Sequence, residues 1–268
     1  MILENIVKKT EERIDAKKKI LPEAELREKA YKIAERELKN TNGQFCFPFE
    51  KALKAEGIAF ICEVKKASPS KGVIAEDFLY LKIACEYEEA GAAAISVLTE
   101  PFYFQGQDHF LEEIAEKVNI PVLRKDFTVD AYMLYEAKCM NASAVLLICA
   151  ILSDSQIAEY LRISRELGLS ALVEAHTEEE VKRALSCGAS VIGVNNRDLK
   201  TFKTDIRVSE QLRQLVPHTL TYVSESGITL PEDIGRLQRI GTDAVLIGET
   251  LMRCRNKKKM MEELKGEA

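Results

Sequence analysis

Residues 58–72 read Ile58-Ala59-Phe60-Ile61-Cys62-Glu63-Val64-Lys65-Lys66-Ala67-Ser68-Pro69-Ser70-Lys71-Gly72. The apolar run at 58–62 has the composition of a strand that is covered on both faces. Because side chains alternate along a strand, Glu63 and Lys65 should point to the same side. A simple ion pair would satisfy both charges. The loop that follows, however, offers hydroxyls, backbone N–H groups and a cation, which suit an anionic ligand.

A short apolar run followed by a polar stretch with helical periodicity recurs along the chain at spacings of about twenty to thirty residues. The expected strands are 58–65, 92–98, 121–125, 143–149, 169–174, 190–195, 219–224 and 243–247. The expected helices lie near 77–90, 107–117, 130–140, 153–167, 177–186, 204–215, 231–240 and 249–265. Eight such units predict an α/β protein of the (βα)8 TIM-barrel class. An open doubly wound sheet would have fewer strands and usually a G-x-G-x-x-G turn after the first, which this sequence lacks.

The chain of 268 residues is long enough for one barrel of roughly 250 residues, but two domains would be cramped. Residues 1–50 are highly charged and have helical periodicity, with a break at Leu21-Pro22. We expect them to form an N-terminal helical extension packed on a catalytic barrel of residues 51–268. Phe45, Phe47 and Phe49 are expected to belong to a packed linker between the two.

Charge and composition exclude several classes of partner. The net charge is −5, and basic residues are mixed with acidic ones, so there is no basic stripe for nucleic acid. The seven cysteines include no C-x-x-C pair and indicate a reducing compartment. Neither a signal peptide nor an apolar run long enough to span a membrane is present, so we expect a cytoplasmic protein. The sequence leaves the oligomeric state open, a monomer included.

Charged residues gather where the expected strands end. In a barrel of this kind the carboxyl ends of the strands carry the chemistry. Those ends contain Glu63 and Lys65, Lys125-Asp126-Phe127, Glu174, Asn195-Asn196-Arg197-Asp198 and Glu225-Ser226-Gly227. Singly, each has an ordinary interpretation, such as a local pair between Lys125 and Asp126. Together at one rim they predict a functional site, with glycine-rich turns after the last two strands that suit a phosphate.

Six blocks of sequence resemble the indole-3-glycerol-phosphate synthase family over essentially the full length. They are Glu63 to Gly72, Leu123-Arg124-Lys125-Asp126-Phe127, Leu172-Val173-Glu174-Ala175-His176, Asn195-Asn196-Arg197-Asp198-Leu199, Ser224-Glu225-Ser226-Gly227-Ile228 and Ile247-Gly248-Glu249-Thr250-Leu251-Met252. One departure is Leu79-Tyr80, where an Asp-Pro-like helix start is expected; it lies away from the site. The resemblance implies a carboxy-lyase of tryptophan biosynthesis that acts on an anionic phosphosugar and needs neither metal nor organic cofactor.

The resemblance also implies roles for individual residues. Lys125 would be the general acid of ring closure and Glu174 the general base, while Lys65 would bind the substrate carboxylate and Glu63 would orient Lys65. The residues to which it assigns catalysis are Lys125, Glu174, Lys65, Glu63, Asn195 and Ser226. Substrate binding falls to Arg197, Phe127, Leu146 and Glu225, and phosphate binding to Ser70, Gly227, Gly248 and Glu249, with Ser226 beside them.

Three other functions stay open on the sequence alone. One is phosphoribosylanthranilate isomerase, although the cysteine base it would need has no counterpart, because Cys62 should face away from Glu63 and Lys65. Another is an aldolase that forms a Schiff base on Lys125. The third is a non-catalytic phosphate-binding barrel, which would not need two lysines and two glutamates at one mouth.

Overall fold

The computed structural model describes residues 2–198 and 201–266, and eight parallel strands within them close into a barrel. The strands in chain order are β1 (Ala59–Val64), β4 (Ala94–Leu98), β5 (Val122–Lys125), β6 (Ala144–Ile148), β7 (Ser170–Ala175), β8 (Val191–Asn195), β9 (Thr221–Glu225) and β10 (Ala244–Ile247). β1 pairs with β4 on one side and with β10 on the other, which closes the ring. The predicted (βα)8 barrel is confirmed, and every expected strand lies within two residues of its predicted ends.

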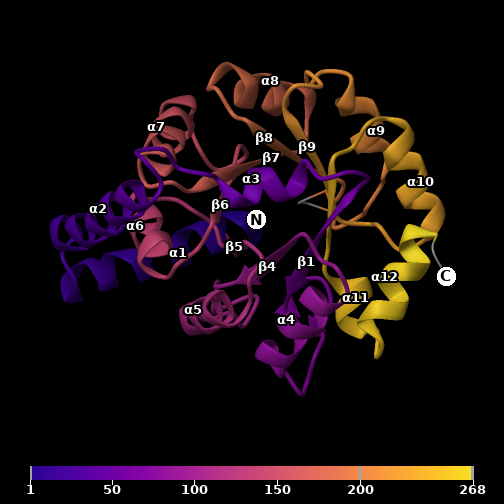
Figure 1. Cartoon of the computed structure of the whole chain (residues 1–268), viewed down its shortest axis with the longest axis horizontal. Helices are drawn as coiled ribbons and strands as arrows, with labels where there is room; N and C mark the ends of the chain where they lie inside the picture. The colour runs from indigo at the N-terminus through magenta and orange to yellow at the C-terminus, as the bar shows by residue number, and fades with distance from the viewer. Residues whose placement is uncertain (1, 199–200, 267–268) are drawn as a thin grey trace.

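Helices surround the strands and cover their outward faces (Figure 1). They are α4 (Tyr80–Glu89), α5 (Asp108–Lys117), α6 (Tyr132–Cys139), α7 (Asp154–Glu166), α8 (Glu178–Ser186), α9 (Arg207–Arg213), α10 (Pro231–Arg239), α11 (Glu249–Arg253) and α12 (Lys257–Lys265). The single helix expected over 249–265 is therefore wrong. The Asn256 side chain accepts the backbone N–H of Lys259 at 3.0 Å, and this cap starts α12 as a separate helix.

The N-terminal segment forms two helices, α1 (Ile2–Ile20) and α2 (Glu23–Asn40), separated at Leu21-Pro22 as the sequence predicts. α2 packs against α6 on the outside of the ring (Figure 1). α1 buries Ile6, Thr10 and Ile14 against the body of the protein. In the described parts of the chain, no helix has both the length and the apolar character to cross a bilayer.

A short helix, α3 (Pro48–Leu53), lies over the centre of the ring in Figure 1. The sequence predicted only a packed linker here, and the boundary expected at residue 50 falls inside this helix. Phe49 and Leu53 are fully buried and pack with Ala59 and Ala244, where β1 and β10 begin. α3 therefore fills the barrel at the amino ends of the strands, which leaves the carboxyl ends for the site.

The loop after β1 is ordered by a small antiparallel hairpin of β2 (Ala67–Ser68) and β3 (Gly72–Val73). Gly72 has a φ of +64°, which glycine adopts without strain. The hairpin is tied to the loop after β4, because the Ala67 N–H donates to the Phe104 carbonyl at 3.3 Å. These two loops together form one wall of the barrel mouth.

Candidate active site

A cavity of about 700 Å³ opens at the carboxyl ends of the strands. All fourteen residues predicted for the site line it: Glu63, Lys65, Ser70, Lys125, Phe127, Leu146, Glu174, Asn195, Arg197, Glu225, Ser226, Gly227, Gly248 and Glu249. Leu199, the last residue of one matching block, lies outside the described residues. The barrel therefore brings together side chains from most of its strands, as the resemblance implied.

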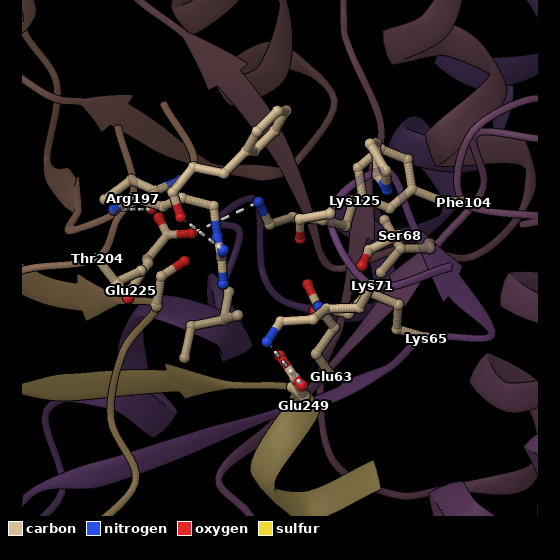
Figure 2. A pocket seen from close by; sticks show the side chains of 18 of the residues that line it. Glu63, Lys65, Ser68, Lys71, Phe104, Lys125, Arg197, Thr204, Glu225 and Glu249 are labelled. Atoms are coloured by element: carbon tan, nitrogen blue, oxygen red, sulfur yellow. Dashed lines mark hydrogen bonds and ion pairs between the residues drawn. The ribbon is translucent and has the colours of Figure 1, made fainter. Parts of the chain in front are cut away.

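Lys125 lies at the end of β5 and points into the cavity (Figure 2). Its Nζ is 3.2 Å from Glu174 Oε2, at the end of β7, and 3.4 Å from Glu225 Oε2, at the end of β9. Both glutamates are nearly inaccessible to solvent. The local pair between Lys125 and Asp126, considered from the sequence, does not form, because Asp126 turns outward to Arg13.

Lys125, Glu174 and Glu225 form a cluster in which the two carboxyl groups have different pKa shifts. Burial opposes the ammonium form of Lys125, but Glu174, Glu225 and Glu63 outweigh it, so the pKa of Lys125 is raised. Burial also opposes ionisation of Glu174, yet Lys125, His176 and a hydrogen bond from Asn195 hold its pKa below the usual value. Burial together with the charges of Glu174 and Glu63 raises the pKa of Glu225 to about 8, against the opposing effect of Lys125. At neutral pH the arrangement therefore contains a charged lysine, an ionised Glu174 and a protonated Glu225.

A second lysine–glutamate pair lies at the end of β1, where Lys65 Nζ donates to Glu63 Oε1. The prediction that the two side chains share one side of the strand is confirmed. Gly248, just after β10, makes room for the pair: a Cβ at this position would lie 2.3 Å from Glu63 Oε1 and 2.9 Å from Lys65 Nζ. Gly248 therefore shapes the site through the side chain it lacks.

Gly193 has the same effect in the middle of β8, and sequence reasoning missed it. A Cβ there would lie 2.3 Å from Glu225 Oε1, an oxygen that has no hydrogen-bond partner among the described residues. A glycine inside an apolar strand is a known sign that another group approaches the backbone closely. That signal could have identified Gly193 from the sequence.

One end of the cavity is suited to an anion. Ser226 and Gly227 have consecutive positive φ values of +68° and +77°, which turn the chain sharply after β9. Ser70 and Lys71 approach from the loop after β1, and Lys71 Nζ is 3.6 Å from Glu249 Oε1 (Figure 2). Glu249 also pairs with Arg253, so its carboxylate is occupied by two cations.

Asn195 and Arg197 follow β8 and extend the polar wall. The Asn195 side chain bonds the Glu174 carboxylate, and its Oδ1 accepts the Arg197 backbone N–H at 3.0 Å. The Arg197 guanidinium is held by the Phe202 carbonyl at 3.2 Å, across a bridge between Arg197 and Thr204. One guanidinium is thereby held over the cavity (Figure 2).

The opposite side of the cavity is apolar. Phe127 and Leu146, both predicted, line it together with Phe104, whose ring centroid is 6.0 Å from that of Phe127. The sequence did not indicate Phe104. It also did not indicate the contribution of α1, which lines the cavity with Ile2, Leu3 and Ile6. Their helical spacing predicted a packed face but not which surface that face would cover.

His176 and Cys62 lie outside the cavity lining. His176 stands behind Glu174, with Nε2 3.4 Å from Glu174 Oε1 and Nδ1 3.3 Å from Glu180 Oε2. Cys62 is buried on the outer face of β1 against Met261, and burial raises the pKa of its thiol. A cysteine at this position cannot act on a molecule in the cavity.

Fold and site together define a (βα)8-barrel enzyme in which acidic and basic groups at the strand ends meet in one cavity that has an end suited to an anion and an apolar side. The family model for indole-3-glycerol phosphate synthase matches residues 3–264. The chain belongs to the indole-3-glycerol phosphate synthase family.

Relatives support this assignment over nearly the whole chain. The chain is 51% identical to an indole-3-glycerol phosphate synthase of Lachnoclostridium phytofermentans over 268 residues, which covers 99% of both proteins. It is 50% identical to one of Ruminiclostridium cellulolyticum, with 100% of both covered.

Two solved structures share the fold at low sequence identity. A tryptophan synthase a2b2 complex structure from Pyrococcus furiosus matches with a TM-score of 0.59 and 16% identity, over 78% of this chain and 98% of the other. A 3-hexulose-6-phosphate synthase matches with a TM-score of 0.61 and 13% identity, over 78% and 99%.

Proposed function

We propose that this chain converts 1-(2-carboxyphenylamino)-1-deoxyribulose 5-phosphate to indole-3-glycerol phosphate, with loss of carbon dioxide and water. The observation that supports this most strongly is the position of Lys125, an ammonium held between Glu174 and Glu225 inside the cavity. The reaction needs an acid and a base close together, because one must protonate an oxygen and the other must take a proton from carbon.

Ring closure is the first chemical step. An aromatic carbon attacks the ribulose carbonyl, and Lys125 donates a proton to the oxygen as negative charge develops there. Loss of carbon dioxide then restores the carbon–carbon double bond. The raised pKa of Lys125 keeps the proton in place until the oxyanion forms.

Dehydration completes the indole. The hydroxyl leaves as water with a proton supplied by Lys65, which Glu63 orients, and Glu174 removes the remaining proton as general base. The lowered pKa of Glu174 keeps this carboxylate ionised and able to accept a proton at neutral pH. Asn195 holds Glu174 in position through its side-chain hydrogen bond.

Binding uses the two ends of the cavity. The phosphate is held by Ser70 and by the backbone N–H groups of Ser226, Gly227, Gly248 and Glu249. Arg197 and Lys65 contact the carboxylate and the ribulose hydroxyls, and Glu225, protonated at neutral pH, contributes a further hydrogen bond. The aromatic ring lies between Phe127 and Leu146 on the apolar side.

Near-ultraviolet spectra during incubation with the anilino-deoxyribulose phosphate test this function directly. An indole absorption band should appear as the substrate is consumed, and neither the isomerase nor a non-catalytic barrel would produce it. Treatment with borohydride in the presence of substrate should leave Lys125 unmodified, since the acid role requires no imine. A stable substrate adduct on Lys125 without any indole band would instead indicate an aldolase.

We further propose that the protein works in the cytoplasm, with residues 1–50 as an extension on a catalytic barrel of residues 51–268. The free thiols and the absence of a membrane-crossing helix among the described residues support this location.

A further inference from the structure

The two neighbours of Lys125 in the sequence, Arg124 and Asp126, are deeply buried and make their side-chain contacts on the outer side of the barrel, although Asp126 also belongs to the cavity lining. Strand alternation sends Lys125 inward and Arg124 outward, and Asp126 follows with its carboxylate also outside the barrel. Arg124 is held by Asp108 at 3.2 Å, by Glu136 at 3.1 Å and by the Met133 carbonyl at 2.8 Å. The backbone that carries Lys125 is thus fixed from the outer side.

Helix α1 completes this outer network. Arg13 donates two hydrogen bonds to Asp126, at 2.9 Å to Oδ1 and 2.8 Å to Oδ2. Lys17, one turn further along α1, reaches Asp108 and Glu136, each at 2.6 Å, which are the same carboxylates that hold Arg124. Residues more than one hundred positions before Lys125 therefore contact the partners of both of its neighbours.

The Asp126 carboxylate has further contacts that reach the backbone of the site. Thr99 Oγ1 donates to it at 2.6 Å, and the Phe127 N–H donates to it at 2.8 Å. The Thr99 N–H in turn donates to the Lys125 carbonyl at 3.2 Å. Asp126 therefore fixes the chain on both sides of itself, at Lys125 and at Phe127.

Arg13 is the residue of this network whose loss should disturb Asp126 most, because it makes the short charged contacts to that carboxylate. The network contains three cations, Arg13, Lys17 and Arg124, and three carboxylates, Asp108, Asp126 and Glu136. The Asp126 side chain has no solvent exposure, and Arg124 approaches it only to 3.7 Å. Loss of Arg13 would remove both short charged contacts of a buried carboxylate and leave only the longer one to Arg124, which is unfavourable, so Asp126 must protonate or move.

We propose that Arg13 is a positioning residue for the reaction: through Asp126 it sets where the Lys125 ammonium and the Phe127 ring lie in the cavity. Helix α1 is then part of the catalytic apparatus and not only a cover for the barrel. The expected change in kcat rests on the proposed function, whereas the expected displacement of Lys125 does not. A displacement of about 1 Å at a reacting group can lower the rate by about a hundredfold.

The test compares Arg13→Met with Lys18→Met in the full-length protein. Lys18 is a matched control: it lies on the same helix and loses the same charge, but it pairs with Asp130 and Glu23, outside the network. In Arg13→Met we expect kcat to fall at least about tenfold while KM stays within about threefold, because the anion sites remain intact. Lys18→Met should leave both constants within about twofold of the parent. Arg13→Lys restores the charge but not the two-point contact and should give an intermediate kcat.

A crystal structure of Arg13→Met separates this inference from the proposed function. We expect the Lys125–Glu174 distance to depart from 3.2 Å. An unchanged distance would overturn the inference whatever the substrate is. Equal losses of kcat in Arg13→Met and Lys18→Met would do the same, because they would mean that α1 contributes only docking. If Arg13→Met does not fold, Arg13→Lys decides, and an unaltered kcat there overturns the proposal. A parent protein that forms no indole refutes the proposed function alone.

Discussion

Glu174 and Glu225 both approach the Lys125 ammonium within 3.4 Å, yet their surroundings give them different protonation states. Glu174 has His176 on its second oxygen and a hydrogen bond from Asn195, and its pKa is lowered. The second oxygen of Glu225 has no partner among the described residues, and its pKa is raised to about 8. One carboxyl can thus accept a proton while the other keeps its own.

Lys125→Met and Glu174→Gln should each lower kcat by about 10²- to 10⁴-fold, the usual contribution of a positioned acid or base. Both variants should still bind the product, because the phosphate and ring contacts are untouched. Steady-state kinetics and equilibrium binding of the product measure the two effects. Lys182→Met is the control, since Lys182 is exposed on α8 and pairs with Glu178 of the same helix. Normal turnover in both site variants would remove the roles assigned to them.

Glu225→Gln should change how stability depends on pH. The unfolded chain loses this proton near the ordinary glutamate pKa of about 4.3, whereas the folded chain keeps it up to about 8. In that interval the folded state binds more protons, so this group makes the parent less stable as pH rises. The stability of Glu225→Gln relative to the parent should therefore increase between about pH 5 and pH 8 and level off above that. Urea denaturation across this range measures it, and a difference that does not vary with pH would contradict the raised pKa.

For single residues, the sequence predicts which side chains meet in the cavity but not which of them form ion pairs. Alternation along a strand is enough to place Glu63 with Lys65. It cannot show that Lys125 pairs with Glu174 and Glu225 rather than with Asp126, because that choice depends on Arg13, which is 113 residues from Asp126. Spacing in the sequence contains no information about such a contact.

One strand and the turn after another create space for charged side chains by having glycine in place of a larger residue. Gly193 in β8 faces Glu225, and Gly248 after β10 faces the Glu63–Lys65 pair. The eight strands are predictable because each is a short apolar run between polar stretches. α3 is not, because six residues are too few to establish a helical period, and its apolar side chains resemble those of a linker.

Gly248→Ala should lower kcat/KM at least about tenfold, because the new Cβ forces Glu63 and Lys65 to move. Overpacking should also lower the free energy of unfolding by about 1–3 kcal/mol. Gly235→Ala in α10 is the control: the nearest atom to its Cβ is Arg239 Nη1 at 3.8 Å. That change should leave kinetics unaltered and raise stability by about 0.5–1 kcal/mol. Kinetic constants and urea denaturation of both variants test this, and equal activities would show that the site tolerates a side chain at Gly248.

The two ends of the barrel have different roles, one in stability and the other in catalysis. α3 and the starts of the strands provide packing at one end, and the loops after the strands provide chemistry at the other. The sequence predicts this division from the barrel class and from the charged strand ends alone. The role of α1 as a cavity wall and as a partner of Asp126 emerges only when the whole chain is folded, because neither contact is local.

Phe49→Ala should lower the free energy of unfolding by about 3–5 kcal/mol, because a large, fully buried ring is removed from the interior of the barrel. Activity per folded molecule should be unchanged at low temperature, since Phe49 does not line the cavity. Urea denaturation and active-site-normalised kcat measure the two quantities. A large loss of kcat with little loss of stability would mean that the two ends are coupled.

Phe49 and Leu53 fill the barrel at the amino ends of the strands, so small molecules cannot enter or leave the cavity from that end. Substrate, product, carbon dioxide and water share the opening at the opposite end. The product must dissociate before the next substrate can bind, so product and substrate exclude each other from the cavity. Accumulated product should therefore slow the enzyme in a way that additional substrate reverses.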